Sequence, residues 1–241
     1  MRAAEIESWL DRTLDIAAFD DVSNNGVQIE RYGGGAAEVA RVAFAVDASV
    51  RAVEAAAAAG AQLLVVHHGI SWGGGVKRIA GGVYGVVKAA MDSDLALYAC
   101  HLPLDAHPRL GNNAQIARLL GLSKVRPAFR YHGNVIGLVG ESRAARRVVM
   151  GERTVELPRG MKVGVCSGGA GEFAEEAKRL GCGLYLTGEA SWGDVVAAEN
   201  CGMRMVCCGH YGTEVFGVRA VAGAMKRALK VDTVDLTEKL R

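Results

Sequence analysis

Short apolar runs alternate with longer amphipathic segments along this chain of 241 residues. In the first half, apolar runs at 42–46, 62–66 and 95–100 are separated by amphipathic segments at 49–59 and 84–91. Short apolar runs bounded by polar residues or glycine are typical of buried strands, and the longer amphipathic segments are typical of helices. The pattern therefore predicts an α/β fold in which strands and helices alternate.

The same hydrophobic pattern predicts the remaining elements. In the first half it predicts an opening helix at 3–17, a glycine-rich loop at 73–82, and a helix that begins at Asn112 or Asn113 and ends at Gly121. Beyond Pro127 the pattern restarts. It predicts strands at 134–139, 153–157 and 161–166, and a helix from about residue 142.

The second half of the chain repeats the order of elements of the first. Residues 42–73 align with residues 163–193, and both segments end in Ser-Trp-Gly. The alignment continues from residues 86–106 to residues 195–215, and it superposes two pairs in which a histidine precedes a carboxylate by four residues. The repeat predicts an internal duplication of a strand-helix-strand-helix-strand unit.

We therefore expect two similar α/β halves, residues 1–126 and residues 127–241, packed around a metal-binding cleft. Ligands in open α/β sheets bind at the carboxyl ends of the strands, and several polar clusters of this chain follow strands directly. Trp72 and Trp192, one in each repeat, are expected to be packing anchors.

Histidines and carboxylates gather at the predicted strand ends. Four of the six histidines follow an apolar run directly, namely His67, His68, His101 and His210. Asp105 and Glu214 each come four residues after one of them. His210 and Glu214 begin a predicted helix, where this spacing puts two side chains on adjoining faces. The pattern predicts a two-metal site formed by His67, His68, Asp105, His210 and Glu214.

Imidazole and carboxylate ligands suit zinc, iron, manganese, cobalt or nickel. Two such ions would lie about 3.5–4 Å apart and promote the ionisation of water near neutral pH, which is hydrolytic chemistry. The six cysteines lie mostly in apolar runs and form no Cys-x-x-Cys motif, so we expect them to be reduced core residues.

Glu189 and Asp47 follow predicted strands as well, and each has two open interpretations. Glu189 occupies the place in the second half that the histidine pair occupies in the first, and it is either a proton carrier or partner of a ligand, or a helix cap. Asp47 is either a partner of a ligand or a helix N-cap, a role for which Ser49 competes.

Charge and hydropathy exclude several classes of function. The net charge is +2, and no run of Lys and Arg is interleaved with aromatic residues, so nucleic-acid binding is not expected. Acidic residues stand where a signal peptide would be apolar, and no stretch reaches the roughly 18 apolar residues of a membrane span. A cytoplasmic protein is expected.

Five motifs together resemble the YbgI-like, Nif-three-like family of dinuclear-metal-centre proteins, also called GTP cyclohydrolase I type 2 homologues. The motifs are Asn25-Gly26-Val27-Gln28, His67-His68-Gly69, Tyr98-Ala99-Cys100-His101 with Leu104-Asp105, Thr187-Gly188-Glu189, and Gly209-His210-Tyr211 with Glu214. The resemblance implies a two-domain α/β subunit and a homo-oligomeric ring of six subunits. It also implies metal ligation by the five residues predicted above, with His101 beside the site.

The resulting hypothesis is a metal-dependent hydrolase that acts on a small nucleotide-like or heterocyclic substrate, with Glu189 or His101 as the catalytic proton carrier. The alternative is a carrier that inserts iron or another metal into a cofactor precursor without turnover. An assembly scaffold that retains a vestigial site is a third interpretation.

Overall fold

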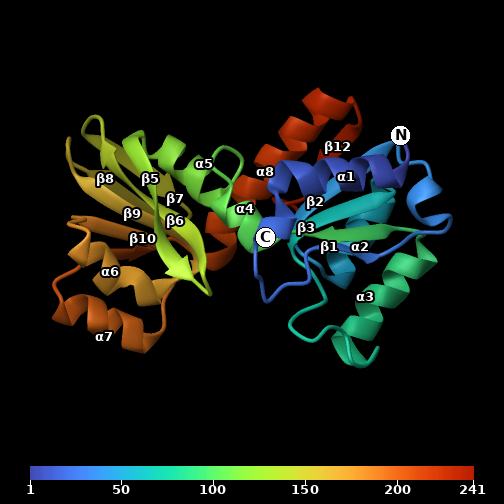
Figure 1. Cartoon of the computed structure of the whole chain (residues 1–241), viewed down its shortest axis with the longest axis horizontal. Helices are drawn as coiled ribbons and strands as arrows, with labels where there is room; N and C mark the ends of the chain where they lie inside the picture. Colours follow the sequence, from blue (N-terminus) through green and yellow to red (C-terminus); the bar gives the residue numbers. More distant parts are fainter. The chain divides into compact units, whose positions relative to one another are not determined.

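The computed structural model describes residues 1–241, and the chain forms two compact units (Figure 1). Unit 1 consists of Met1–Leu104 together with Val218–Arg241, and unit 2 consists of Asp105–Gly217. The boundaries fall within two helices, α4 (Leu102–Ala106) and α8 (His210–Leu229). Each unit contains a five-stranded sheet with helices, which confirms the predicted α/β class.

Unit 1 is built on a sheet with the strand order β1-β4-β3-β2-β12. The strands are β1 (Gly26–Ile29), β2 (Arg41–Asp47), β3 (Leu63–His68), β4 (Ala96–Ala99) and β12 (Asp232–Asp235). Four of them run parallel, and β1 is antiparallel to β4. Because β2, β3 and β4 are parallel, their carboxyl ends meet at one edge of the sheet.

Helices cover the sheet of unit 1. They are α1 (Ala3–Leu14), α2 (Val50–Ala58) and α3 (Gly81–Asp92), with short 3₁₀ turns at Ile16–Ala18 and Gly34–Ala36. The core joins Leu64, Val66 and Leu97 of the strands to Val53 of α2 and Val86 of α3. In Figure 1, α1 lies on the opposite side of this sheet from α3. These buried apolar positions are the ones that the alternating pattern predicted.

Unit 2 contains a sheet with the order β11-β10-β9-β6-β5 and a separate hairpin of β7 and β8. The strands are β5 (Leu122–Tyr131), β6 (Asn134–Ser142), β7 (Arg146–Met150), β8 (Arg153–Leu157), β9 (Lys162–Gly169), β10 (Leu184–Glu189) and β11 (Met205–Cys207). The helices are α5 (Asn112–Leu119), α6 (Ala174–Arg179) and α7 (Trp192–Asn200), with a 3₁₀ turn at Gly171–Phe173. Strands β9, β10 and β11 are parallel, whereas β5 and β6 are antiparallel neighbours.

The same order of elements occurs in both units. Unit 1 contains β2-α2-β3-α3-β4 and unit 2 contains β9-α6-β10-α7-β11, each with three adjacent parallel strands. The neighbouring strands differ. In unit 1 an antiparallel strand, β1, pairs with the last of the three parallel strands, β4, whereas in unit 2 an antiparallel strand, β6, pairs with the first of them, β9. The common order is what the repeat predicted, and the duplication itself stays a prediction.

The limits of the compact units differ from the expected division at residue 126, which lies inside β5. Residues 218–241 belong to unit 1 because β12 pairs in parallel with β2, with Val234 opposite Ala43. Residues 105–121 belong to unit 2 because Ile116 and Leu120 enter the core of that unit.

The helix predicted from about residue 142 is wrong, because the chain forms β7 there. Arg146 and Arg147 are exposed and Met150 is buried, and β7 pairs with β8 from Arg146 opposite Leu157 to Met150 opposite Arg153. The basic side chains of Arg146 and Arg147 therefore lie on the exposed face of a hairpin, whose other face enters the core of unit 2.

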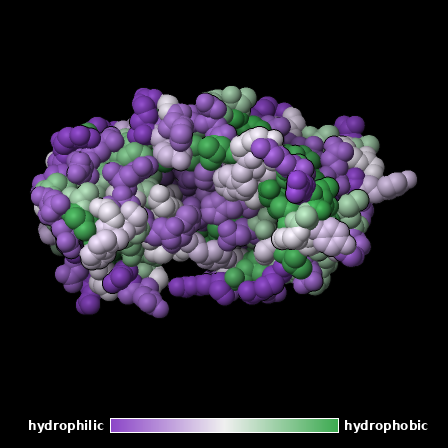
Figure 2. All heavy atoms as spheres, turned by 90° about the horizontal axis from the view of Figure 1, so that it is seen from below, coloured by the Kyte–Doolittle hydropathy of each residue, from purple (hydrophilic) through white to green (hydrophobic).

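None of the helices is both long and apolar enough to cross a membrane. On the face shown in Figure 2, hydrophilic residues are interspersed with smaller hydrophobic groups. All six cysteines are free thiols, and four of them are buried, as expected from the sequence.

Candidate metal centre

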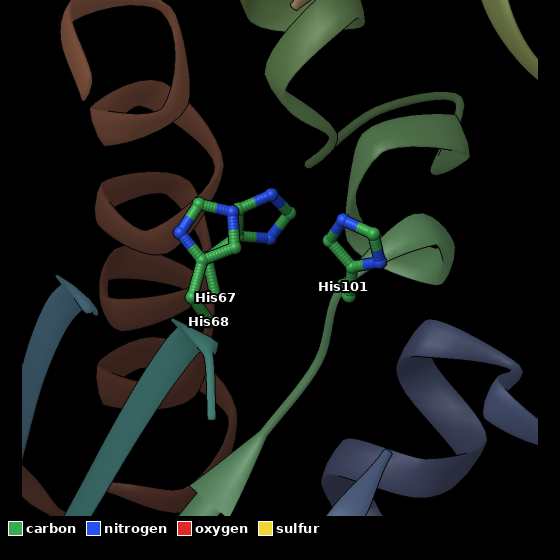
Figure 3. A group of neighbouring side chains, drawn as sticks. All are labelled: His67, His68 and His101. Atoms are coloured by element: carbon green, nitrogen blue, oxygen red, sulfur yellow. The ribbon is translucent and has the colours of Figure 1, made fainter. Parts of the chain in front are cut away.

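Three histidines of unit 1 converge at the edge where the parallel strands end (Figure 3). His67 and His68 are the last residues of β3, and His101 follows β4, the parallel neighbour of β3. The ring centroid of His67 lies 4.6 Å from that of His68 and 5.2 Å from that of His101. One nitrogen from each ring lies within 4.8 Å of the other two, so the group can hold a metal ion.

Each of these imidazoles has its Nδ1 next to an oxygen atom. The Nδ1 atoms lie 2.9 Å from the Cys100 carbonyl oxygen for His67, 2.7 Å from Asp47 Oδ1 for His68, and 2.9 Å from Asp21 Oδ1 for His101. A carbonyl or carboxylate oxygen can only accept, so each Nδ1 donates and the lone pair stays on Nε2. Partners of this kind orient the histidine ligands of metal sites, and the donor set therefore fits a divalent metal ion.

Asp47 resolves one of the two open interpretations. It lies opposite His68 in the register of β2 and β3, and its carboxylate contacts that imidazole. The N-cap of α2 is Ser49, whose Oγ accepts from the backbone N–H of Ala52 at 3.1 Å. Asp47 is therefore the partner of a histidine rather than a helix cap.

Residues Asp21–Gln28, a segment without histidine, form hydrogen bonds with the loop after β3 and with the chain after β4. In this Asp21–Gln28 segment, Gln28 Oε1 accepts from the backbone N–H groups of Ile70 and Ser71 at 2.7 and 3.1 Å. Asp21 and Asn25 of the same segment bind the chain at His101. Gly69 leaves the space that Gln28 occupies, since a Cβ at 69 would lie 2.2 Å from Gln28 Oε1.

Trp72 belongs to the surroundings of the histidines rather than to the core. Its Nε1–H donates to the Gly69 carbonyl at 2.9 Å, and its ring meets that of His101 edge-on at 5.1 Å. The side chain is 38% exposed, and Trp192 in unit 2 is 78% exposed. The expectation that both tryptophans are packing anchors is therefore wrong.

In unit 2, His210 lies between two carboxylates. Its Nε2 is 3.1 Å from Glu214 Oε1, one turn along α8, and its Nδ1 is 2.9 Å from Glu189 Oε1. The hydrogen bond with Glu214 is the largest cause that raises the pKa of His210 to about 9, burial opposes it, and Glu189 adds to the increase. The arrangement favours a positive charge at this point, either a proton on His210 or a cation.

Asp105 is held by polar neighbours inside unit 2. Its Oδ1 accepts from Asn112 Nδ2 at 2.8 Å and from Ser167 Oγ at 2.9 Å, and the residue is 7% exposed. Asn112 in turn accepts from the backbone N–H of Gly217 in α8 at 2.6 Å. A buried carboxylate fixed in this way is suited to bind a cation.

The structure thus brings together His67 and His68 with His101 in unit 1, and His210 and Glu214 with Glu189 in unit 2. Sequence reasoning missed four polar partners of these residues, namely Asp21, Asn25, Asn112 and Ser167. A signal existed for Asn25, which begins the motif Asn25-Gly26-Val27-Gln28.

Gly168 makes room for the carboxylate of Glu214. Its φ is +70°, and a Cβ there would lie 2.5 Å from Glu214 Oε1 and 3.4 Å from His210 Nε2. We expect Gly168→Ala to displace Glu214 and lower metal affinity by on the order of 10-fold or more, as disturbed partners of metal ligands do. A competition titration with a zinc chelator measures this.

The matched control is Gly133→Ala, where φ is +84° and a Cβ would meet nothing within 4 Å. Both variants carry the backbone strain of alanine at positive φ, about 1–2 kcal/mol. If Gly133→Ala weakened metal binding as much as Gly168→Ala, the contact with Glu214 would not be the cause.

A sheet edge lined with oriented imidazoles in one unit, and a half-buried histidine paired with a buried carboxylate in the other, define an α/β protein with candidate metal ligands in both units. The family model of Duf34/NIF3 (NGG1p interacting factor 3) matches residues 1–239. The chain belongs to this family, which confirms the resemblance of its motifs.

Named relatives and a solved structure are similar over nearly the whole chain. A GTP cyclohydrolase 1 type 2 homolog of Pyrococcus horikoshii is 38% identical and covers 95% of both chains. Another so named, from Deinococcus radiodurans, is 40% identical over 92% of this chain and 88% of its own. The solved structure of protein ybgI, described as of unknown function, has a TM-score of 0.84 with 29% identity and 98% coverage of both chains.

Proposed function

We propose that this protein binds two divalent metal ions through His67, His68, Asp105, His210 and Glu214, and hydrolyses a small nucleotide-like or heterocyclic substrate. The observation that carries the proposal is the pair of imidazoles at the end of β3, His67 and His68, whose Nδ1 atoms are each held by an oxygen acceptor. The name shared by the relatives, GTP cyclohydrolase 1 type 2 homolog, supports the class of substrate.

Bound divalent ions would supply Lewis acidity and promote the ionisation of water near neutral pH. The residues of the chain supply the rest. His101 keeps the lone pair on Nε2 because its Nδ1 donates to Asp21, so it can accept a proton at that atom. Glu189 holds the Nδ1 of His210 at 2.9 Å, which supports a role in orienting that imidazole.

The cytoplasmic location, which the sequence leads us to expect, and the assembly of six chains, which the family resemblance implies, belong to the same proposal. The native metal is zinc, iron, manganese, cobalt or nickel according to the donor set. Elemental analysis of protein purified without added metal identifies the ion and its number per chain.

The test is turnover by purified protein loaded with zinc, manganese or iron, against GTP, other nucleotides and simple esters. We expect Glu214→Ala to lower kcat/KM on at least one substrate by on the order of 100-fold or more, because removing a ligand exceeds the effect of removing a partner of one. Glu175→Gln, at an exposed position of α6, is the control and should behave as the wild type.

Absence of turnover with every metal would contradict the hydrolase. If that protein nevertheless bound metal and released it to a chelator or to a metal-free acceptor, the alternative of a metal carrier for cofactor biosynthesis would hold instead.

A further inference from the structure

We propose that Asp21 is a positioning residue that fixes the tautomer and the orientation of His101. In this role it keeps the Nε2 of His101 on the side of His67 and His68 as the proton acceptor of the reaction. The inference rests on the hydrolase proposed above and deepens it, because it selects His101 rather than Glu189 as the proton carrier and names the residue that prepares it.

The carboxylate of Asp21 is buried and saturated with donors. Its side chain is 1% exposed. Oδ1 accepts from His101 Nδ1 at 2.9 Å and from the backbone N–H of Ser23 at 3.0 Å, and Oδ2 accepts from Leu102 N–H at 2.8 Å and Asn25 Nδ2 at 2.9 Å. A carboxylate has about four acceptor positions. Those of Asp21 are filled by donors from Ser23 and Asn25 and from the chain after β4.

These contacts leave His101 one tautomer. An ionised carboxylate can only accept, so Nδ1 carries the hydrogen and Nε2 carries the lone pair. Burial acts to raise the pKa of Asp21, but the hydrogen bond and charge of His101, with Asn25 and Ser23, hold that pKa below its ordinary value. The carboxylate therefore stays ionised, as the donor pattern requires.

Asn25, in the same segment as Asp21, fixes the backbone of His101. Its N–H donates to Asn25 Oδ1 at 2.8 Å, and Asn25 donates to Asp21 in turn. The Leu102 contact alone would serve to begin α4, so the bond to the imidazole is not needed for the helix. Figure 3 shows one ring nitrogen of His101 directed toward His67 and His68. In catalytic triads a buried aspartate orients histidine in the same way.

The tautomer can be measured without substrate. Solid-state ¹⁵N NMR of metal-free protein labelled only in histidine distinguishes Nδ1–H from Nε2–H, and comparison with His101→Gln assigns the signal. We expect the Nδ1–H form in the wild type. Asp21→Asn should shift His101 toward the Nε2–H form, because the amide can donate to Nδ1 while its oxygen still accepts from Leu102 N–H.

In zinc-loaded protein, Asp21→Asn should lower kcat by about 10–100-fold with KM and bound zinc nearly unchanged. Asp92→Asn, at an exposed position of α3, is the control for the loss of one negative charge. A merely structural role for Asp21 would lower stability and leave the tautomer as it is.

Three results would overturn the inference: an Nε2–H tautomer in the wild type, an unchanged tautomer in Asp21→Asn, or loss of zinc in His101→Gln comparable to that in His67→Ala. The last would make His101 a ligand. Failure of the hydrolase proposal is separate, because it shows as no turnover in the wild type, while the tautomer still decides what Asp21 does.

Discussion

Replacement of His67 by alanine is expected to lower the affinity of the protein for divalent metal by at least about 100-fold, more than the loss of a ligand's partner. His67 is fully buried at the end of β3, and its Nδ1 is bound to the Cys100 carbonyl. The bond to the carbonyl fixes the orientation of the ring, so the replacement removes a positioned Nε2 lone pair. Elemental analysis after dialysis, followed by a chelator competition, measures the loss.

The control is His132→Asn, in the turn between β5 and β6 of unit 2. Its φ is +43°, a conformation that asparagine tolerates, so the replacement tests the loss of a histidine elsewhere. Circular dichroism verifies that His67→Ala is folded. A folded His67→Ala protein that retains the metal content and affinity of the wild type would contradict the metal centre.

The second large effect is expected in the core of unit 2, where Tyr185→Ala should lower the free energy of unfolding by about 3–5 kcal/mol. Tyr185 is fully buried in β10, its ring meets Phe129 edge-on at 5.3 Å, and its hydroxyl donates to the Ala170 carbonyl at 2.6 Å. Burial raises the pKa of this phenol well above its ordinary value, so the hydroxyl remains a donor. Urea unfolding followed by fluorescence measures the change.

Tyr185→Phe separates the two contributions in that side chain. It keeps the ring and leaves the Ala170 carbonyl without the phenolic donor, which costs about 1–3 kcal/mol. If Tyr185→Phe were as destabilising as Tyr185→Ala, packing of the ring against Phe129 would contribute little, contrary to the geometry.

Sequence patterns predict the centre of each sheet better than its edges. The parallel strands β2, β3, β9 and β10 are buried on both faces, so they appear in the sequence as apolar runs. β12 reads Asp-Thr-Val-Asp and has no apolar run, although it pairs with β2. Short strands at edges depend on the neighbour that accepts them, and the local sequence contains no sign of that neighbour.

The residues of the candidate site could likewise be predicted only in part. His67, His68 and His210 could be predicted because they stand at the ends of apolar runs, where parallel strands bring ligands together. Asp21 contacts a histidine 80 residues away, and Ser167 contacts Asp105 across 62 residues. Such pairs arise only when the sheet is assembled, so spacing along the chain does not reveal them.

The Asp21–Gln28 segment supports the loops after β3 and β4 through side-chain hydrogen bonds to their backbone. Most of these bonds go to backbone N–H groups, and the segment specifies the residue type at only two positions of the loops: the imidazole of His101, which Asp21 binds, and Gly69, where a Cβ would meet Gln28. Replacements other than proline at Ile70, Ser71 and Leu102 should therefore leave both loops supported. Replacement of Asp21, Asn25 or Gln28 should loosen them, although none of the three is a proposed metal ligand.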